Sequence, residues 1–446
     1  MTANFSPFVE PVEPSPNLPE QADVVIIGGG IIGCAAAWFL AKSGTSVALC
    51  EKGRIAGEQS SRNWGFCRQQ GRDPKEIPLI QESLRIWRGL ESEIETDVGF
   101  RQAGVLYVAN SQEAMAQNEA WLVHAKQHGL DTRLLSSDET AAALPGGSRT
   151  WQGAMQTPSD GRAEPSKAAP ALARAALDQG ATVHTECAVR GIETEARRVS
   201  AVVTEKGVIR TEAVICAGGA WSRLFCGNLG IHLPQLKVMS SVLRTTEAPL
   251  ISESGVWAPN FAFRRRQDGG YTVANGSRIV ADIVPDSFRL FTTFLPAMMM
   301  ERKSTTLRLG RRFIEEMTTP GHWRLDEQTP FEKTRVLDPS PHQGSLNEAI
   351  SNFRSAFPVL EDVKVAESWA GLIDLTPDAV PVISAVDGNE GLYLATGFSG
   401  HGFGIGPGAG RLIAELVTGT EPCVDPTPFR YSRFVDGSKL RPLSGV

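Results

Sequence analysis

The stretch Asp23–Gly33 reads DVVIIGGGIIG, and it determines the fold expected for this chain. Its first five residues form a short, largely apolar run with β-branched side chains, typical of a strand buried in a parallel sheet. Glycines then occupy the three positions of a GxGxxG pattern, and an Ala-rich stretch with helical character, Cys34–Lys42, follows. This order of strand, glycine turn and helix predicts a dinucleotide-binding unit.

Each glycine of the turn meets a structural requirement that a residue with a side chain would not. Gly28 permits the tight turn, Gly30 lets the backbone approach a pyrophosphate, and Gly33 lets the helix pack closely on the strand. The helix that starts at Ile31 and Ile32 points its free N–H groups and the positive end of its dipole at the phosphates. We therefore expect these five residues to bind the cofactor.

The residues after the second predicted strand, Ser46–Cys50, favour FAD over NAD. Glu51 closes that strand, where a carboxylate accepts hydrogen bonds from a ribose hydroxyl. The loop that follows offers hydroxyl, guanidinium and amide donors to a second phosphate and to a flavin ring; a polar surface loop is the alternative interpretation. The cofactor residues expected here are Glu51, Lys52, Gln59, Ser60, Ser61, Arg62, Asn63 and Gly65.

The composition is that of an ordinary globular chain of two or three domains, with 446 residues, 41% hydrophobic and 21% charged. The net charge of −6 argues against a nucleic-acid partner. Seven scattered cysteines without a CxxC pair predict reduced thiols in a cytoplasmic protein. No signal-peptide pattern or membrane-spanning apolar run is visible, and the Pro-rich, acidic residues 1–20 predict a flexible arm.

Several separated blocks resemble the D-amino acid oxidase-like family of FAD-dependent amine oxidoreductases, which includes glycine oxidase and monomeric sarcosine oxidase. Ala217–Ser222 (AGGAWS), Thr376–Asp378 (TPD) and Thr396–Phe403 (TGFSGHGF) are similar to flavin-binding segments of that family. The resemblance implies an α/β fold, α+β overall, with a Rossmann-like FAD-binding domain and an interleaved antiparallel-sheet substrate domain of the glutathione reductase type.

A closer resemblance is to the bacterial L-amino acid deaminases. It is carried by IAGEQSSR at Ile55–Arg62, VTEKG at Val203–Gly207, SRLF at Ser222–Phe225 and PFEK at Pro330–Lys333. Those deaminases have an N-terminal membrane anchor, which this sequence does not display, so the resemblance leaves the membrane electron acceptor open.

The family resemblance also implies a division of the chain and further cofactor contacts. The flavin domain would comprise residues 21–100, 150–235 and 360–430, the substrate domain residues 101–149 and 236–359, and a tail residues 431–446. The added cofactor residues are Val189, Ala217, Gly218, Trp221, Gly371, Gly397, Gly400, His401, Gly402, Phe403 and Gly404.

An amino-acid substrate brings a carboxylate, for which the planar fork of arginine is the best partner. Arg278 is the first choice, because by resemblance it matches the arginine that holds the substrate carboxylate in the deaminases. Arg68 follows the flavin loop and loosely matches an arginine of sarcosine oxidase, and Arg264 is the third choice. A solvated surface arginine is the alternative interpretation, and it is favoured for the run Arg264–Arg266.

His401 is the fourth residue predicted to take part in catalysis. Its family counterpart lies close to flavin and substrate, where a histidine can hydrogen-bond or tune the charge. A structural histidine in a tight glycine turn is the alternative. The other six histidines form no HxxxH or HxH pattern, so no metal site is expected.

Two positions depart from sarcosine oxidase, which resembles this chain around TPD and SGHGF. Its flavin is attached to a cysteine five residues before the TPD threonine, and a lysine after SGHGF helps to bind the carboxylate. These positions are Gly371 and Gly404 here. We therefore expect noncovalent FAD and room for a substrate with a larger side chain.

The resemblance implies that hydride passes from the carbon bearing nitrogen to flavin N5, and that the imine hydrolyses to a keto acid and ammonia. The leading hypothesis is an amino acid oxidase, deaminase or dehydrogenase. The alternatives are an oxidase of secondary or N-methyl amines, a flavin-binding subunit of an electron-transfer complex, and an NAD enzyme.

A predicted cationic helix around Met298–Met317 suits a peripheral membrane or an electron-acceptor contact, although an ordinary amphipathic helix is favoured. Stereochemistry, electron acceptor and oligomeric state stay open.

Overall fold

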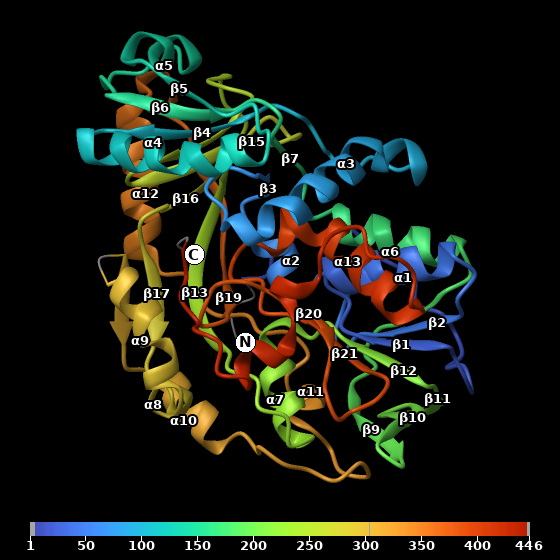
Figure 1. Cartoon of the computed structure of the whole chain (residues 1–446). Helices are drawn as coiled ribbons and strands as arrows, with labels where there is room; N and C mark the ends of the chain where they lie inside the picture. Colours follow the sequence, from blue (N-terminus) through green and yellow to red (C-terminus); the bar gives the residue numbers. More distant parts are fainter. Residues whose placement is uncertain (1–4, 303, 444–446) are drawn as a thin grey trace.

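Two large β-sheets organise residues 5–302 and 304–443, which are the residues that this computed structural model describes (Figure 1). The first sheet has six strands in the order β20-β21-β12-β1-β2-β8, parallel except for the pairing of β20 with β21. Its strands are β1 (Val24–Ile27), β2 (Val47–Cys50), β8 (Thr182–His184), β12 (Ala213–Cys216), β20 (Val382–Ala385) and β21 (Leu392–Thr396).

Both faces of this parallel sheet are covered, which explains why β1 and β2 are apolar throughout. Val24 and Ile26 face a helical layer, while Val25 faces the three-stranded sheet β11-β10-β9. Glycine permits close packing of the helices, since a Cβ at Gly410 would lie 2.4 Å from the Cβ of Ala35. The covering elements are α1 (Ile31–Lys42), α3 (Ile77–Glu93), α6 (Ala168–Asp178), α13 (Gly402–Thr418), β9 (Val189–Glu195), β10 (Arg198–Thr204) and β11 (Gly207–Arg210).

The second sheet has ten strands and is largely antiparallel. An aromatic core that includes Phe261, Phe263, Tyr271 and Phe353 joins it to helix α12 (Gln343–Ala356). Its strands are β4 (Val105–Ala109), β5 (Arg133–Leu135), β6 (Gly153–Thr157), β13 (Leu236–Thr245), β14 (Gly255–Ala258), β15 (Phe261–Arg265), β16 (Tyr271–Ala274), β17 (Ile279–Asp282), β18 (Thr305–Arg308) and β19 (Val365–Leu375).

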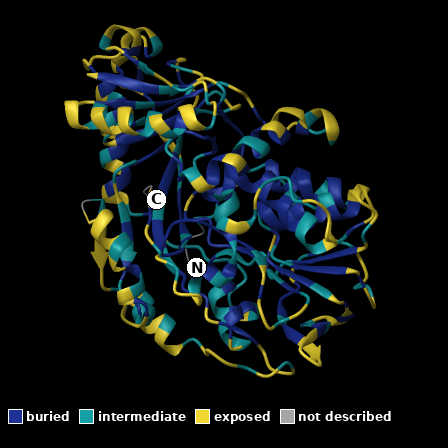
Figure 2. Cartoon of the chain, viewed as in Figure 1, coloured by how far each residue is buried: buried dark blue, intermediate teal, exposed yellow. Residues whose placement is uncertain are grey.

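The outer elements are more exposed than the two sheets, as Figure 2 shows for α4, α5 and the α8–α10 segment. Short elements at the centre connect the two sheets instead. The outer helices are α4 (Gln112–Gln127), α5 (Ser137–Ala143), α8 (Pro285–Arg289), α9 (Phe291–Met300) and α10 (Arg311–Thr318); the central elements are α2 (Gln59–Arg62), β3 (Phe66–Cys67), β7 (Gly161–Arg162), α7 (Ser222–Asn228) and α11 (Pro330–Lys333).

The mixed α/β class expected from the sequence is confirmed, but some predicted elements are wrong. The continuous helix around Met298–Met317 is interrupted, because β18 pairs in parallel with β17 and separates α9 from α10. The last long helix, α13, begins at Gly402 and contains Pro407.

The strand pairing crosses the ranges expected for the domains. Strands β6 and β19 fall in ranges predicted for the flavin domain, yet both pair within the ten-stranded sheet. The described part of the predicted flexible arm also differs from expectation, because it is hydrogen-bonded along its length. Ser15 N–H donates to Val183 O at 2.7 Å, and Arg210 N–H donates to Glu20 O at 3.0 Å.

Candidate active site

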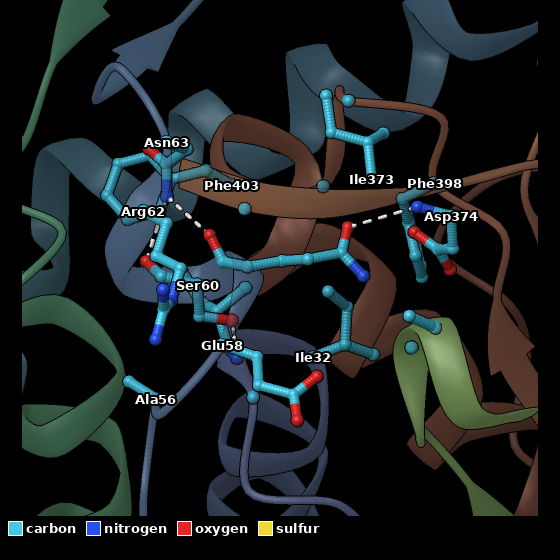
Figure 3. Close-up of a pocket in the computed structure, with 18 of the residues that line it drawn as sticks. Ile32, Ala56, Glu58, Ser60, Arg62, Asn63, Ile373, Asp374, Phe398 and Phe403 are labelled. Carbon is cyan, nitrogen blue, oxygen red and sulfur yellow. Dashed lines mark hydrogen bonds between the residues drawn. The ribbon is translucent and has the colours of Figure 1, made fainter. Parts of the chain in front are cut away.

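One long cavity runs between the two sheets, and Figure 3 shows part of its lining. Two groups of lining residues differ in character, and each is named here. The nucleotide region comprises Gly28, Gly30, Ile31, Ile32, Glu51, Lys52, Gln59, Ser60 and Ala217–Trp221; the arginine region comprises Trp64, Phe66, Arg68, Arg72, Trp257, Ile279 and His401.

The glycine turn in the nucleotide region is closely packed. Gly28 has φ of +110°, and a Cβ there would lie 2.5 Å from the carbonyl oxygen of Ala217. A Cβ at Gly33 would lie only 2.0 Å from the carbonyl oxygen of Gly28. Any side chain at these positions would therefore push the turn away from β12 or from α1.

The N-terminus of α1 presents backbone donors in the nucleotide region. The N–H of Cys34 is the first in the helix to donate to a main-chain acceptor, the carbonyl oxygen of Gly30 at 2.9 Å. Ile31 N–H donates to Ser60 Oγ at 2.9 Å, so the N–H groups of Ile32 and Gly33 have no partner within the helix. Such free amides at a helix N-terminus form an anion site suited to a pyrophosphate.

Glu51 lies where the sequence predicts it, at the end of β2. Its carboxylate accepts the N–H of Gly29 and the N–H of Gly53, both at 2.7 Å. Burial raises its pKa above the usual value. Because each carboxylate oxygen has a second lone pair, these bonds leave capacity for a ribose hydroxyl.

Arg62 and Asn63 have other partners than those expected. The guanidinium of Arg62 bonds Asp338 Oδ1 and the carbonyl oxygen of Ala370, both at 2.8 Å. The Asn63 side chain donates to Ser60 O and accepts from Gly65 N–H, both at 2.8 Å. These two side chains line the cavity but organise the loop, so they are not the free phosphate donors that sequence reasoning expected.

Glu58 was not singled out in the sequence, and it organises the same region (Figure 3). Its Oε1 accepts Lys52 Nζ at 2.8 Å, Trp221 Nε1 at 3.0 Å and Leu337 N–H at 3.0 Å. Lys52 also lies over the Trp221 ring, 4.5 Å from its centroid. No local motif identifies Glu58, because its three partners come from separate parts of the chain.

Asp374, on β19, is a second cavity residue that sequence reasoning missed. Its Oδ2 accepts Gly397 N–H at 2.8 Å and Gln235 Nε2 at 3.1 Å. Burial raises its pKa to about 6. The same Gln235 amide donates to Gly219 O at 3.2 Å. Asp374 therefore links strand β19 to Gly397, just before the SGHGF segment, and through Gln235 to the nucleotide region.

Arg68 is the predicted carboxylate-binding arginine that lies in the cavity. It is 8% exposed, and its guanidinium carbon lies 5.6 Å from the Trp257 ring centroid and 5.7 Å from that of Tyr107. Its Nη1 donates to the carbonyl oxygen of Gln70. Among the described residues no carboxylate lies within ion-pair distance of Arg68, although this arginine lowers the pKa of the nearby buried Asp160. The guanidinium therefore faces the cavity without a direct carboxylate contact.

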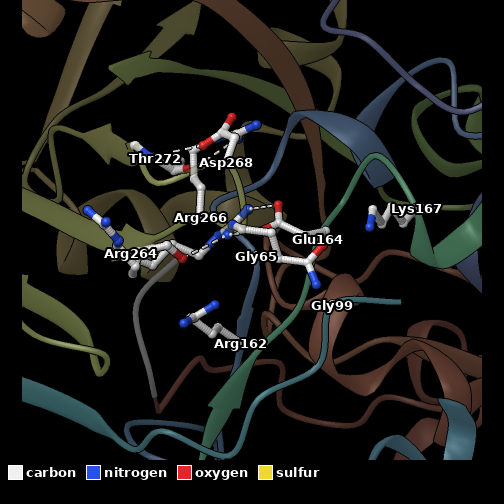
Figure 4. Close-up of polar contacts among 12 residues, drawn as sticks. Gly65, Gly99, Arg162, Glu164, Lys167, Arg264, Arg266, Asp268 and Thr272 are labelled. Atoms are coloured by element: carbon white, nitrogen blue, oxygen red, sulfur yellow. Dashed lines mark hydrogen bonds and ion pairs between the residues drawn. The ribbon is translucent and has the colours of Figure 1, made fainter. Parts of the chain in front are cut away.

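Arg264 is buried outside the cavity and is held by Glu164 (Figure 4). Its Nη1 and Nη2 bond the two oxygens of that carboxylate at 2.8 and 2.9 Å, and its Nε donates to Trp64 O. Arg264 lowers the pKa of Glu164 to about 2 against the effect of burial. The solvated turn favoured for Arg264 is wrong, and its guanidinium serves structure rather than substrate.

Arg278, the first choice from the sequence, lies outside the cavity lining. Its side chain is 54% exposed, and its Nε lies 3.3 Å from Glu348 Oε2. Its neighbours Asn275, Gly276 and Ile279 do line the cavity. Arg278 lies in the turn between β16 and β17, and its side chain points outward.

His401 lies at the start of α13 and is 4% exposed. Its Nδ1 is 3.2 Å from Glu76 Oε2, and the same oxygen is 3.3 Å from Arg72 Nη1. Burial lowers the pKa of His401, although Glu76 acts in the opposite direction. Burial would raise the pKa of Glu76, but His401 and Arg72 together hold it below its usual value.

The two glycines that depart from sarcosine oxidase have packing roles. A Cβ at Gly404 would lie 2.9 Å from Cys67 Cα and 3.0 Å from Phe66 O, so this glycine lets α13 approach β3. A Cβ at Gly371 would lie 3.2 Å from Arg62 Cβ. The explanation that both glycines enlarge the substrate space is therefore wrong for Gly404, where backbone fills that space.

Comparison with known proteins agrees with this geometry. Residues 23–416 match the family model described as DAO, FAD dependent oxidoreductase. The chain belongs to this DAO family. Its cofactor is FAD, and it is an oxidoreductase that acts on amino acids or amines.

Individual relatives of this DAO-family chain include deaminases and oxidases. L-amino acid deaminase from Proteus myxofaciens, solved with anthranilate, is 36% identical, with a TM-score of 0.93 over 97% of this chain and 98% of that one. Glycine oxidase from Pseudomonas aeruginosa is 27% identical over 91% of this chain and 97% of its own length. Mitochondrial sarcosine dehydrogenase from Mus musculus is 26% identical, and the match spans 43% of that protein.

The lining residues fit FAD. Free amides of α1, the Glu51 carboxylate and closely approaching glycines suit the dinucleotide, and FAD supplies the hydride acceptor when bound. All predicted cofactor residues line the cavity except Gly33, Ser61 and Gly397.

Within the described residues no group of three metal-ligating side chains occurs. Lining residues that sequence reasoning missed are Glu58, Trp64, Phe66, Arg72, Phe225, Ser240, Trp257, Asn275, Ile279, Phe331, Arg335, Ile373, Asp374 and Phe398.

Proposed function

We propose that this chain oxidises the C–N bond of an α-amino acid with noncovalently bound FAD, giving an imine that hydrolyses to a keto acid and ammonia. The observation that carries the proposal is Arg68, a buried cation in the cavity with no carboxylate of the described residues within ion-pair distance. An α-amino acid supplies that partner, whereas a simple amine would leave the cation unpaired at a cost of several kcal/mol. The similarity to L-amino acid deaminase supports the same substrate class.

Arg68 is oriented before any substrate arrives. Tyr107 and Trp257 flank its guanidinium, and Gln70 O fixes one nitrogen. Arg72 Nε donates to Arg68 O at 2.7 Å and fixes its backbone. Less side-chain entropy is then lost on binding, and the fork can hold both carboxylate oxygens of the substrate.

The aromatic wall around Arg68 excludes water from the reacting carbon. Trp64 and Trp257 pack edge to face with ring centroids 4.8 Å apart, and Trp64 and Phe66 with centroids 5.8 Å apart. Exclusion of water strengthens the contact between Arg68 and the carboxylate, because the local dielectric is low. It also delays hydrolysis of the imine until the product leaves.

The experiment is anaerobic bleaching of the flavin by a panel of L- and D-amino acids, N-methyl amino acids and simple amines, followed by exposure to oxygen. We expect bleaching by amino acids with a free α-carboxylate and none by the matching decarboxylated amines. A chain bleached by N-methyl amines but inert to free amino acids would instead be a secondary-amine oxidase. A chain that stays oxidised with every compound would be an electron-transfer subunit.

The Arg68→Met variant tests the carboxylate contact directly. Loss of this charge should lower kcat/KM for amino acids by about 10²–10³-fold, because a charged hydrogen-bonded contact is lost in a desolvated site. FAD content should remain that of the wild type. Arg335→Met is the matched control, since this arginine lines the cavity but is paired with Glu205.

A separate observation supports peripheral contact with an anionic membrane. The α8–α10 surface exposes apolar side chains, with Phe288 68%, Met299 67% and Met317 60% exposed, next to exposed Arg289 and Arg311. No helix among the described residues is long and apolar enough to cross a membrane. Cosedimentation with phosphatidylserine vesicles should fall when Phe288 and Met299 are changed to serine; equal sedimentation of the variant would contradict this contact. The cytoplasmic location stays a prediction.

A further inference from the structure

The carboxylate of Glu76 forms a buried pair with the ring of His401 behind the arginine region. Glu76 was not indicated by the sequence patterns that predicted the site. Glu76 is fully buried at 0% exposure, in a short helical turn before α3. His401 comes from the other end of the chain. The Glu76 Oε2 atom lies within 3.3 Å of both Arg72 Nη1 and His401 Nδ1.

The charges of this group assign the protonation of His401. The pKa of Glu76 lies below the usual carboxyl value beside the Arg72 guanidinium, so this carboxyl is ionised at neutral pH, whereas burial lowers the pKa of His401 and favours the neutral ring. A neutral imidazole has one N–H and one acceptor nitrogen. Since Nδ1 faces the carboxylate, the proton resides on Nδ1, and Nε2 has a free lone pair.

Neither ring nitrogen of His401 makes a hydrogen bond among the described residues: Nδ1 lies 3.2 Å from Glu76 Oε2 without hydrogen-bond geometry, while Nε2 has no such neighbour, although it is buried and its residue lines the cavity. An acceptor left unsatisfied in a buried place is costly and indicates an absent donor. The charged groups around the ring are Glu76, Arg72 and Arg68. The positive charge of the two arginines disfavours binding of a metal ion at Nε2. A protonated amine differs from a metal ion, because it can donate a proton to Nε2.

Arg72 links this histidine to the proposed carboxylate contact. Its Nη2 donates to His401 O at 3.0 Å, and its Nε donates to Arg68 O at 2.7 Å. One buried side chain therefore fixes the backbone of both residues. The carboxylate and the ammonium group of an α-amino acid are attached to the same carbon. A pair of linked residues, an arginine for the carboxylate and a hydrogen-bond acceptor for the ammonium group, therefore suits such a substrate.

We propose that His401 Nε2 is the acceptor for the proton of the substrate ammonium group, and that Glu76 is the positioning residue that holds His401 as the Nδ1–H tautomer. This inference rests on the proposed function. The N–H bond of the ammonium breaks, its electron pair stays on nitrogen, and the proton forms a bond to Nε2. The positive charge moves to the imidazolium, beside the Glu76 carboxylate. The freed lone pair of the amine is what C–H cleavage by hydride transfer requires.

The first test needs no substrate and uses the holoprotein with ¹⁵N-labelled histidine. Long-range ¹H–¹⁵N spectra at pH 8 should show His401 as the Nδ1–H tautomer, with the signal assigned by its loss in His401→Gln. The Nε2–H tautomer, or an imidazolium at this pH, would overturn the inference. The proposed function would survive that result if amino acids still bleach the flavin.

The second test is the pH dependence of the anaerobic bleaching rate. His401→Gln should slow bleaching by about 10²-fold near pH 7, and the loss should shrink as rising pH deprotonates the substrate amine in solution. Glu76→Gln keeps an oxygen that accepts from Nδ1–H but loses the charge that stabilises the imidazolium. We expect an intermediate loss of about 10-fold, and an acid limb shifted to lower pH.

Glu164→Gln is the matched control, because Glu164 is equally an arginine-paired buried carboxylate but lies outside the cavity. It should lower Tm and leave the shape of the pH profile unchanged. A loss in His401→Gln or Glu76→Gln that is the same at every pH would show a purely structural role. That outcome would overturn the assignment of His401 as a proton acceptor.

Discussion

In the nucleotide region of the cavity, most groups suited to the cofactor are backbone atoms and small residues that lie close together in the sequence. In the arginine region they are large side chains from distant segments, such as Arg68, Trp257 and His401. The nucleotide region depends on glycines that let backbone segments approach one another closely. The arginine region depends on which charged side chains already have an ion-pair partner, as a comparison of the arginines shows.

Four arginines differ in burial and in partner, although the residue type is the same. Arg62 is paired with Asp338 and Arg264 with Glu164, whereas Arg278 is solvent-exposed beside Glu348. Arg68 is buried in the cavity and lacks such a partner among the described residues. A buried cation without a partner indicates a binding site, while a paired one indicates a structural element.

The largest effect is expected from a methyl group in the nucleotide region. Gly33→Ala would place a Cβ 2.0 Å from the Gly28 carbonyl oxygen, so we expect loss of FAD and destabilisation by several kcal/mol. The 450 nm absorbance and Tm of the purified protein measure this. Gly89→Ala is the control, because nothing lies within 4 Å of its Cβ, and it should stabilise α3 by about 0.5–1 kcal/mol. A yellow Gly33→Ala protein with normal Tm would contradict the packing argument.

A smaller but still large effect should follow from breaking a paired arginine. Arg264→Leu leaves Glu164 buried without its partner, which should cost about 3–5 kcal/mol in unfolding free energy measured by urea denaturation. Replacing both residues with leucine should cost less. Amino-acid oxidation per bound FAD should persist in either variant. Loss of carboxylate selectivity in Arg264→Leu would instead give Arg264 a substrate role.

Each region also has a buried aspartate whose pKa burial raises to about 6: Asp374 beside the nucleotide region, and Asp160, which accepts Gln69 N–H at 2.7 Å next to Arg68. A raised carboxyl pKa adds stability that is complete below the unfolded value of 3.8 and is lost as pH rises to about 6. The loss is on the order of 3 kcal/mol for each group.

Urea denaturation at several pH values between 4 and 7 tests this pH dependence. Relative to the wild type, Asp160→Asn and Asp374→Asn should each gain stability across that window, because asparagine does not ionise. A difference between variant and wild type that is constant with pH would show that the carboxyl in question titrates normally.

The smallest effect is expected at the exposed arginine. Arg278→Ala should change unfolding free energy by less than about 1 kcal/mol, because its contact with Glu348 is largely solvated. We expect kcat/KM for amino acids to change by no more than about 3-fold, against the large loss in Arg68→Met. A 100-fold loss in Arg278→Ala would return the carboxylate contact to Arg278 and break the distinction between these arginines.

Prediction from sequence succeeded where local pattern and local structure coincide. Gly28, Gly30, Glu51 and Gly400–Phe403 line the cavity, and at the glycine turn chain geometry alone brings a strand, a turn and a helix start together. The order in which the sequence favoured Arg278, Arg68 and Arg264 for the substrate carboxylate does not match their positions in the structure. The exposure and the ion-pair partner of each arginine depend on residues far away in the sequence. Glu164 lies 100 positions from Arg264, and no local signal joins them.

By itself, the sequence determined the parallel-sheet dinucleotide fold and the FAD-type turn, because short-range apolar patterns and glycine positions control them. Only the tertiary structure decided which buried arginine lacks a direct ion-pair contact and which nitrogen of His401 faces Glu76. Those properties arise from charges that folding brings together from separate segments, and Coulomb energies in a buried site depend on distance in space rather than along the chain.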